Sequence, residues 1–370
     1  MVFRPVTVCE VCKSGDVMVS TGIGVCAACL RERPSVSLSV VMERHRETRK
    51  AEGLVPEPPR SRGGVHCDFC ANECVIGEGH AGYCGLRRNI QGRLEGGVTR
   101  GNFSWYFDPL PTNCVADWVC PAGTGAGYPR FAHRNGPERG YKNLAVFSQV
   151  CSFDCAFCQN GDFRRLTLRP TWHTAGELVD AADDMTSCIC YFGGDPSPQM
   201  PVFLEASRLA RKRAGGRILR FCWETNGSFN SSLLDAAMDI SLLSGGCVKF
   251  DLKAFNSAIH RALAGSDNSR TLENFIRAAA RIHERPDPPP LVASTLLVPG
   301  YIDSREVGKI ASFIAGLDCS IPYSLLAFAP HLHMTDLPLT SRGHAEECLS
   351  AAMDAGLKRV RLGNAHLLGP

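Results

Sequence analysis

KNLAVFSQVCSFDCAFC, residues 142–158, joins a short apolar run to three closely spaced cysteines. The run Asn143–Phe147 is rich in residues that favour buried strands, so it predicts a β-strand. Cys151, Cys155 and Cys158 follow in the pattern C-x3-C-x2-C, which is not a usual zinc spacing. Three thiolates on one loop can hold three irons of a cubane cluster and leave the fourth iron open. We interpret the triplet as ligands of a site-open [4Fe–4S] cluster, with an incomplete zinc knuckle or a redox motif as the weaker alternative.

Short apolar runs alternate with helical patterns through the rest of the chain. Thr174 with Glu177, and Asp303 with Glu306, have the spacing of capping pairs at helix starts. Alternating strands and helices predict parallel pairing with right-handed crossovers, and six or seven such units favour a partial (β/α)6-type barrel over an eightfold one. The predicted strands are Asn143–Phe147, Cys188–Phe192, Arg217–Trp223, Val248–Leu252, Leu291–Val298, Tyr323–Phe328 and Arg359–Leu362. The predicted helices are Thr174–Asp184, Val202–Arg213, Ser231–Asp239, Thr271–Glu284, His344–Ala355 and a segment around Val307–Ile314.

The composition is that of a globular protein with nearly balanced charge. The 370 residues include 40 Lys+Arg and 37 Asp+Glu, which gives no electrostatic reason to expect nucleic acid or a membrane surface as a partner. No apolar run approaches the roughly 18 residues of a membrane helix. Arg4, Glu10 and Lys13 interrupt the N-terminus, so no signal peptide is expected there. We therefore expect a cytoplasmic protein.

Cysteine is the unusual residue, with 19 copies. A disulfide scaffold of that density is normally short and secreted, whereas clustered cysteines in a cytosolic chain more often bind metal. Six cysteines stand singly or as a C-x-C pair inside apolar runs and are predicted to be small buried side chains. These six are Cys188, Cys190, Cys222, Cys247, Cys319 and Cys348.

The first four cysteines pair two C-x2-C knuckles at a spacing typical of zinc ribbons and rubredoxin-like sites. They are Cys9, Cys12, Cys26 and Cys29. Two knuckles complete a tetrahedron, so the site is closed and structural, and a segment this short needs the metal to fold. We predict a metal module over residues 1–35, with zinc favoured and iron as the alternative.

A charged segment, residues 36–64, separates this module from a second cysteine-rich region. Its part Glu43–Gly64 is polar, then rich in Pro, Arg and Gly, which predicts a helix end followed by a semi-extended linker. The second region, residues 65–140, holds a four-ligand set suited to a closed iron–sulfur cluster or to another zinc, and the spacing does not separate the two. That set is Cys67, Cys70, Cys74 and Cys84. Cys114 and Cys120 either join it, serve as substrate-facing or redox thiols, or are buried loop side chains.

At the triplet the chain resembles the radical S-adenosylmethionine (radical SAM) enzymes, whose hallmark is three such cysteines after the first barrel strand. Gly193–Asp195 is similar to the family's GGE-type turn. Trp223–Gly227 and Lys249–Lys253 resemble the DTNG and DLK segments of the pyruvate formate-lyase activating enzyme group, and Val298–Gly300 matches its VPG turn. Over residues 65–370 the similarity is nearest to activating-enzyme-like members, including the AmmeMemoRadiSam-type radical SAM protein, whose Cys-rich segment before the barrel resembles the second cysteine set.

The resemblance implies a fold, cofactors and contacts. The open iron would bind S-adenosylmethionine (SAM), and an electron from a ferredoxin or flavodoxin would cleave it to a 5′-deoxyadenosyl radical, which abstracts hydrogen from an unidentified small molecule or protein. An exposed cluster of this kind implies an oxygen-poor, anaerobic setting. Phe157 would pack near adenine, and a monovalent cation would bind near the SAM carboxylate at Glu224, Thr225 and Asp251, with glutamate in place of the group's usual aspartate. The remaining implied cofactor contacts are Gly193, Gly194, Asp195, Asn226 and Lys253.

Two alternative functions stay open at this point. One is a true activase that installs a glycyl radical on a partner enzyme. The other is a zinc or iron–sulfur binding or electron-transfer protein without catalysis. The triplet argues against the second alternative, because a pure electron carrier gains nothing from an open iron.

Overall fold

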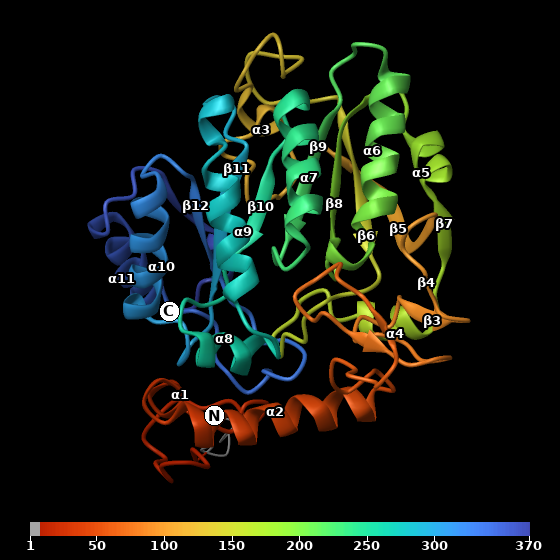
Figure 1. Ribbon diagram of the computed structural model, residues 1–370. Helices are drawn as coiled ribbons and strands as arrows, with labels where there is room; N and C mark the ends of the chain where they lie inside the picture. Colours follow the sequence, from red (N-terminus) through yellow and green to blue (C-terminus); the bar gives the residue numbers. More distant parts are fainter. Residues whose placement is uncertain (1–7) are drawn as a thin grey trace.

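A nine-stranded sheet forms the centre of the part of the chain that the computed structural model describes, residues 8–370 (Figure 1). Arg4 and the start of the predicted 1–35 module lie outside the described residues. In spatial order the strands are β13 (Val360–Gly363), β12 (Tyr323–Ala327), β11 (Leu291–Leu297), β10 (Val248–Asp251), β9 (Arg220–Thr225), β8 (Thr186–Gly193), β6 (Lys142–Ser148), β5 (Arg100–Pro109) and β7 (Trp172–Thr174).

The strands β6 and β8–β13 all pair in parallel. Strand β5 runs antiparallel to β6, and β7 runs antiparallel to β5. Strands β13 and β7 are the two edges, and within the described residues they do not pair with each other, so the sheet stays open. The predicted partial barrel is therefore confirmed, with β5 and β7 as an antiparallel extension that the alternating pattern did not indicate.

Helices connect the parallel strands and bury their apolar faces against the sheet (Figure 1). They are α5 (Ala175–Ala181), α6 (Met200–Ala214), α7 (Ser231–Ser244), α8 (Ser257–Ala264), α9 (Ser269–Ala279), α10 (Ser304–Leu317) and α11 (Arg342–Asp354). The predicted capping box of α5 is present in both directions between Thr174 and Glu177. At α10 the Asp303 carboxylate accepts from the Glu306 amide, but the Glu306 carboxylate instead accepts from the amides of Phe255 and Asn256.

Several predicted boundaries were wrong by a few residues. Strand β9 begins at Arg220 rather than Arg217, because Arg217 lies in the turn after α6 and binds surface carbonyl groups. Helix α7 continues beyond Asp239 to Ser244 and ends at Gly245, whose φ of +85° suits a residue without a Cβ. The predicted helix Thr271–Glu284 divides into α9 and a 3-10 turn at Ile282–Glu284.

The segment predicted as a charged linker is helical in its first part. Helix α2 covers Pro34–Ala51, follows the short α1 (Ala27–Glu32), and contacts α8 on the barrel (Figure 1). Every fourth residue of α2 is buried, which is the stripe of a helix packed on one side. The stripe consists of Ser37, Val41, His45 and Arg49. Because three of these four side chains are polar, apolar periodicity could not reveal the buried face. The domain boundaries themselves stay predictions.

Two small antiparallel hairpins and two short helices complete the fold. The hairpins pair β1 (Val65–His66) with β2 (Val75–Ile76) and β3 (Arg88–Ile90) with β4 (Arg93–Glu95). The short helices are α3 (Pro121–Thr124) and α4 (Phe163–Leu168), and α3 lies at the end of the sheet opposite α2 (Figure 1). Among the described residues, no helix combines the length and hydropathy needed to cross a membrane.

Candidate functional site

The cysteine triplet lies in the loop directly after β6, at the carboxyl ends of the parallel strands. Cys151 and Cys155 are buried and Cys158 is half-buried. A cavity of about 1380 Å³ opens beside them. In sheets of this kind, ligands bind at the carboxyl ends of the strands because the loops there are free to vary. The triplet therefore lies where ligand-binding sites are usually found in this type of fold.

All twelve residues that the sequence analysis assigned to the triplet and its cofactors line this one cavity. They are Cys151, Cys155, Phe157, Cys158, Gly193, Gly194, Asp195, Glu224, Thr225, Asn226, Asp251 and Lys253. They come from the loop after β6, from β8, β9 and β10, and from the loops that follow these strands, so they are spread over about a hundred positions of the chain. The structure brings the predicted residues together, while the role of each one stays a prediction.

The Gly193–Asp195 turn is fixed by close backbone packing. A Cβ on Gly194 would lie 2.3 Å from the Val150 carbonyl oxygen, so glycine is required there. Asp195 is buried, and burial raises the pKa of its carboxyl group. Its Oδ1 accepts hydrogen bonds from Thr225 Oγ1 (2.9 Å) and from the Asn226 amide (2.8 Å). The Asp195 carboxylate therefore ties the turn to β9, which leaves the backbone of the turn to face a ligand.

The carboxylates of the predicted cation site already have lysine partners. Glu224 Oε1 lies 2.6 Å from Lys249 Nζ, and Asp251 pairs with Lys253. Lys249 and Lys253 are buried, whereas the side chains of Glu224 and Asp251 are 31% and 39% exposed. A monovalent cation at this place would have to displace a lysine from its carboxylate.

The triplet thiols are suited to bind a cationic centre. Burial raises the pKa of all three thiols, to about 12 for Cys155, whereas the charge of Lys253 opposes this rise at Cys155 and Cys158. The Phe153 amide donates to Cys151 Sγ at 3.4 Å, as amides do to metal-bound sulfur. Two buried thiols and one half-buried thiol that line one cavity from a single loop fit an iron–sulfur cluster, which they would hold by three of its irons.

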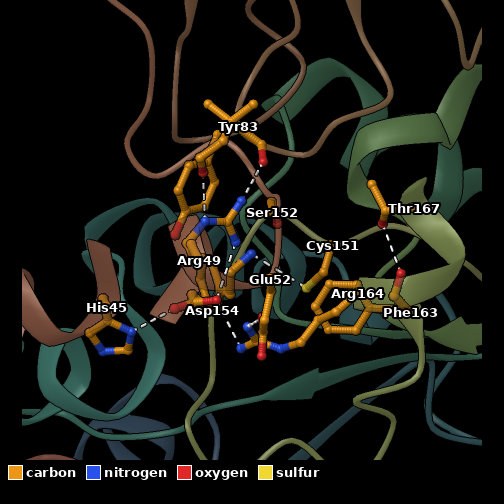
Figure 2. A network of polar contacts seen from close by, with 12 residues as sticks. His45, Arg49, Glu52, Tyr83, Cys151, Ser152, Asp154, Phe163, Arg164 and Thr167 are labelled. Atoms are coloured by element: carbon orange, nitrogen blue, oxygen red, sulfur yellow. Dashed lines mark hydrogen bonds and ion pairs between the residues drawn. The ribbon is translucent and has the colours of Figure 1, made fainter. Parts of the chain in front are cut away.

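The loop between the first two thiols is anchored by a buried charge network (Figure 2). Asp154 Oδ2 lies 2.7 Å from His45 Nδ1, and its Oδ1 lies 3.2 Å from Arg49 Nη1 and 2.8 Å from Arg164 Nη2. Arg49 Nη2 also donates to the Tyr83 carbonyl at 2.7 Å. The network therefore joins α2, the second cysteine region and α4 to the triplet loop.

Sequence reasoning missed this network. Burial alone would raise the pKa of Asp154, but the hydrogen bond from His45 and the charges of Arg164 and Arg49 outweigh it and lower the pKa. The signal that could have found it is the four-residue spacing of His45 and Arg49 within the buried stripe of α2.

A second cavity of about 820 Å³ adjoins the first inside the barrel. Both cavities are lined by Cys114, Glu224 and Lys249, where Lys249 Nζ lies 3.0 Å from Cys114 Sγ and 3.2 Å from Cys190 Sγ. We call this second cavity the inner chamber. Its wall carries six thiols, which are Cys114, Cys120, Cys188, Cys190, Cys222 and Cys247. Of the alternatives for Cys114 and Cys120, the structure therefore favours thiols that face a cavity.

The Cys9–Cys29 set is compact. All four sulfurs lie within 4.8 Å of one another, and Cys12 Sγ lies 4.0 Å from Cys26 Sγ. Zn–S bonds of 2.3 Å in a tetrahedron separate sulfurs by roughly 3.8 Å. The Cys26 amide donates to Cys9 Sγ at 3.4 Å. This set can therefore hold one metal ion.

The Cys67–Cys84 set lies around the β1–β2 hairpin. Cys67, Cys70 and Cys74 are buried and Cys84 is half-buried, and Cys67 and Cys74 share a small core with Tyr83. Within residues 8–370, the Cys9–Cys29 set is the group in which at least three ligand atoms all lie within 4.8 Å of one another. No three of the Cys67–Cys84 sulfurs are that close together.

Comparison with known proteins agrees with this arrangement. The sequence profile of the Radical SAM superfamily matches residues 145–314. The uncharacterized protein MJ0808 of Methanocaldococcus jannaschii is 24% identical over 311 residues, which are 81% of each chain. The isethionate sulfite-lyase activating enzyme of Desulfovibrio desulfuricans is 33% identical over 178 residues, 46% of this chain and 51% of that enzyme.

The pyruvate formate-lyase 1-activating enzyme of Escherichia coli is 29% identical over 142 residues, 35% of this chain and 52% of that enzyme. The chain thus spans about half the length of the two activating enzymes. The superfamily match begins within β6 and includes the triplet, the Gly193–Asp195 turn and the ends of β9 and β10. Over residues 145–314 the chain is therefore similar to the radical SAM superfamily, and this similarity identifies it as an enzyme.

Proposed function

We propose that this enzyme cleaves SAM reductively at a [4Fe–4S] cluster held by Cys151, Cys155 and Cys158, and uses the resulting radical to abstract hydrogen from a substrate. The observation that supports this most is the single cavity that all twelve predicted residues line. A cluster with three protein ligands offers its fourth iron to that cavity. A reductant of the ferredoxin or flavodoxin class would supply the electron.

The chain's own residues would bind and orient SAM. When bound, the cluster supplies one electron to the SAM sulfonium, which yields methionine and a 5′-deoxyadenosyl radical. Phe157 and the Gly193–Asp195 turn form walls of the cavity close to the thiols, and Lys253 Nζ lies 5.3 Å from the centre of the Phe157 ring. Lys253 is buried and charged, so it suits the carboxylate of an amino acid. The buried walls would shield the reacting atoms from water.

The inner chamber is the place where a substrate would meet the radical. It adjoins the first cavity at Cys114, Glu224 and Lys249 and extends into the barrel interior. The segment from residue 110 to residue 123 lines it from one side. A chamber of this size suits a small molecule, with Lys249 and Glu224 as charged groups where it adjoins the first cavity.

A second candidate function is the activation of a glycyl radical enzyme. Its support is the similarity to two activating enzymes, one for isethionate sulfite-lyase and one for pyruvate formate-lyase 1. For this function a loop of a partner protein would have to reach the same cavity. A partner that co-purifies with the chain and develops a glycyl radical signal in electron paramagnetic resonance, only when SAM and reductant are added, would favour activation over a small substrate.

The proposal is tested by anaerobic reconstitution with iron and sulfide, reduction with dithionite, and measurement of 5′-deoxyadenosine from added SAM. The wild-type protein should form it, and Cys155→Ala should not, because two thiolates cannot hold the cluster in its catalytic state. Cys348→Ala removes a buried thiol far from the triplet in sequence and should retain formation. Continued cleavage by Cys155→Ala, or a wild-type cluster whose spectrum does not respond to SAM, would contradict the proposal.

A further inference from the structure

The Cys67–Cys84 region lies directly against the triplet loop. Asn72 Nδ2 donates to the Ser152 carbonyl at 2.7 Å, and Ser152 follows the first triplet cysteine. The Ala71 amide donates to the Ser228 carbonyl at 2.8 Å, which attaches the same turn to the segment after β9. Both contacts come from residues between Cys70 and Cys74. The four thiols are therefore part of the scaffold that positions the triplet, although they belong to a separate hairpin.

A buried arginine beside these thiols has two nitrogen atoms without a hydrogen-bond partner among the described residues. Arg87 is 1% exposed, and its guanidinium lies 3.6 Å above the centre of the Phe69 ring. Its Nη1 donates to the Gly96 carbonyl, but Nε and Nη2 have no hydrogen-bond partner among the described residues. A buried cation with unpaired donors is costly unless an anion compensates it.

The thiols are the anions that Arg87 can meet. The guanidinium interacts electrostatically with Cys84, Cys67 and Cys70, and less strongly with the Asp68 carboxylate. A metal centre bound by four thiolates carries net negative charge, so it would compensate Arg87 and accept its free N–H groups. The Tyr83 amide donates to Cys74 Sγ at 3.4 Å, which adds another donor typical of metal-bound sulfur.

Sulfur spacing distinguishes the kinds of metal centre. Four thiolates on one zinc lie roughly 3.8 Å apart, since each Zn–S bond is 2.3 Å. The Cys9–Cys29 sulfurs are close to that spacing, since all four lie within 4.8 Å of one another. No three of the Cys67–Cys84 sulfurs lie within 4.8 Å of one another. A centre with several irons holds its ligands on different metals and so further apart. The wider set therefore matches a polynuclear centre.

We propose that Cys67, Cys70, Cys74 and Cys84 bind an iron–sulfur cluster, with Arg87 as its buried counter-charge. This site lies outside the SAM cavity, and the proposal does not depend on the proposed function. It resolves the two alternatives that spacing in the sequence left equal, and it places a second redox centre against the loop that carries the triplet.

Metal analysis of the full-length protein tests the proposal. Iron, sulfide and zinc per chain are measured after anaerobic reconstitution, in the wild type and in the double variant Cys74→Ala/Cys84→Ala, which leaves only two of the four thiols and so too few to hold a cluster. We expect iron per chain to fall by about two or about four, with an equal loss of sulfide and no change in zinc. Cys348→Ala serves as the matched control and should lose neither metal. If zinc falls by about one per chain while iron is unchanged, or if neither metal changes, the proposal is wrong.

Substitution of Arg87 tests its role through the reduction potential of the cluster, which would not change if Arg87 only stabilised the fold. Arg87→Gln removes the charge, and this should lower the reduction potential of the cluster, because a nearby cation stabilises the reduced, more negative form. Arg87→Lys should restore most of the potential. Identical potentials in all three proteins would refute the role of Arg87. Formation of 5′-deoxyadenosine with dithionite is scored separately, so a failure of the proposed SAM cleavage would leave the metal result unaffected, and the reverse also holds.

Discussion

The Cys9–Cys29 module and the Cys151–Cys158 loop use the same ligand atom for opposite purposes. In the module, the four sulfurs all lie within 4.8 Å of one another, so a metal ion bound by all four would have no position left for another ligand. In the loop, three thiols lie on one side of a cavity of about 1380 Å³, with glycine, lysine and carboxylate groups opposite. The first arrangement is closed and therefore structural, and the second is open and therefore suited to catalysis.

The two regions also differ in what holds them in place. The four sulfurs of the module come from its own residues. The module attaches to the barrel through a shared apolar core, through the Arg31–Asp303 ion pair and through the hydrogen bonds of Tyr301. The open loop is too short to position itself, and charged side chains from α2 and α4 hold it through Asp154. The open site thus depends on distant parts of the chain. It has three protein ligands where the closed site has four, so its ligands alone hold the loop less firmly.

The largest expected effect is loss of the closed module when its metal is removed. Cys12→Ala deletes an exposed sulfur, so little packing is lost, yet a structural zinc contributes on the order of 10 kcal/mol to folding of such a segment. Hydrogen exchange over residues 9–33 should become fast, and metal analysis should show one ion fewer per chain. Cys319→Ala, a half-buried thiol outside the three sets, is the control. Unchanged exchange after proven metal loss would show that the module folds without its ion.

The next effect concerns the support of the open loop. Asp154→Asn leaves the Arg49 and Arg164 guanidinium groups buried beside a neutral amide, and breaking a buried ion pair in this way costs about 3–5 kcal/mol. Urea unfolding at neutral pH should show this as a lower midpoint. Asp180→Asn removes the partner of Arg213 at an exposed position and should change stability by roughly 0–1 kcal/mol. Equal midpoints for the two variants would mean that the network does not support the loop.

Sequence patterns predicted the sheet and the cavity lining better than the buried side chains of α2 that hold the triplet loop. The strands are short apolar runs, and the cavity residues follow strand ends, so both leave a local pattern. The buried stripe of α2 did not, because Ser37, His45 and Arg49 are polar, and His45 and Arg49 pair with Asp154, which is more than 100 residues away in the chain. Four thiols of the inner chamber, Cys188, Cys190, Cys222 and Cys247, were predicted as isolated buried side chains, because no local pattern encodes the strand pairing that brings them together.

The pH dependence of stability is a second test of the loop's support. The folded-state pKa of Asp154 lies below its unfolded value of about 3.9, so the unfolded chain binds a proton that the native protein does not. The stability that Asp154 contributes is therefore complete above about pH 5 and declines as the pH falls further. The gap in urea midpoint between wild type and Asp154→Asn should shrink from pH 7 to pH 4. A gap that stays constant or widens would contradict the lowered pKa.

The smallest effect tests how the closed module is attached to the barrel. The Tyr301 hydroxyl donates to the Val25 carbonyl at 3.1 Å and accepts from the Ser20 amide at 3.1 Å, and the tyrosine is fully buried. Tyr301→Phe keeps the ring but leaves one buried carbonyl and one buried amide without this partner, which should cost about 1–3 kcal/mol.

A bound ion at the predicted Cys9–Cys29 site would hold the module together, so the loss should appear as faster exchange where the module meets the barrel, with metal content unchanged. Tyr128→Phe, at an exposed tyrosine, is the matched control and should leave exchange and stability as in the wild type. If Tyr301→Phe released the metal, the module would depend on the barrel for its closure, and the contrast between a self-sufficient closed site and a supported open one would fail. If exchange at the contact stayed slow, the attachment would rest on the packing of α1 and α2 against α8 instead.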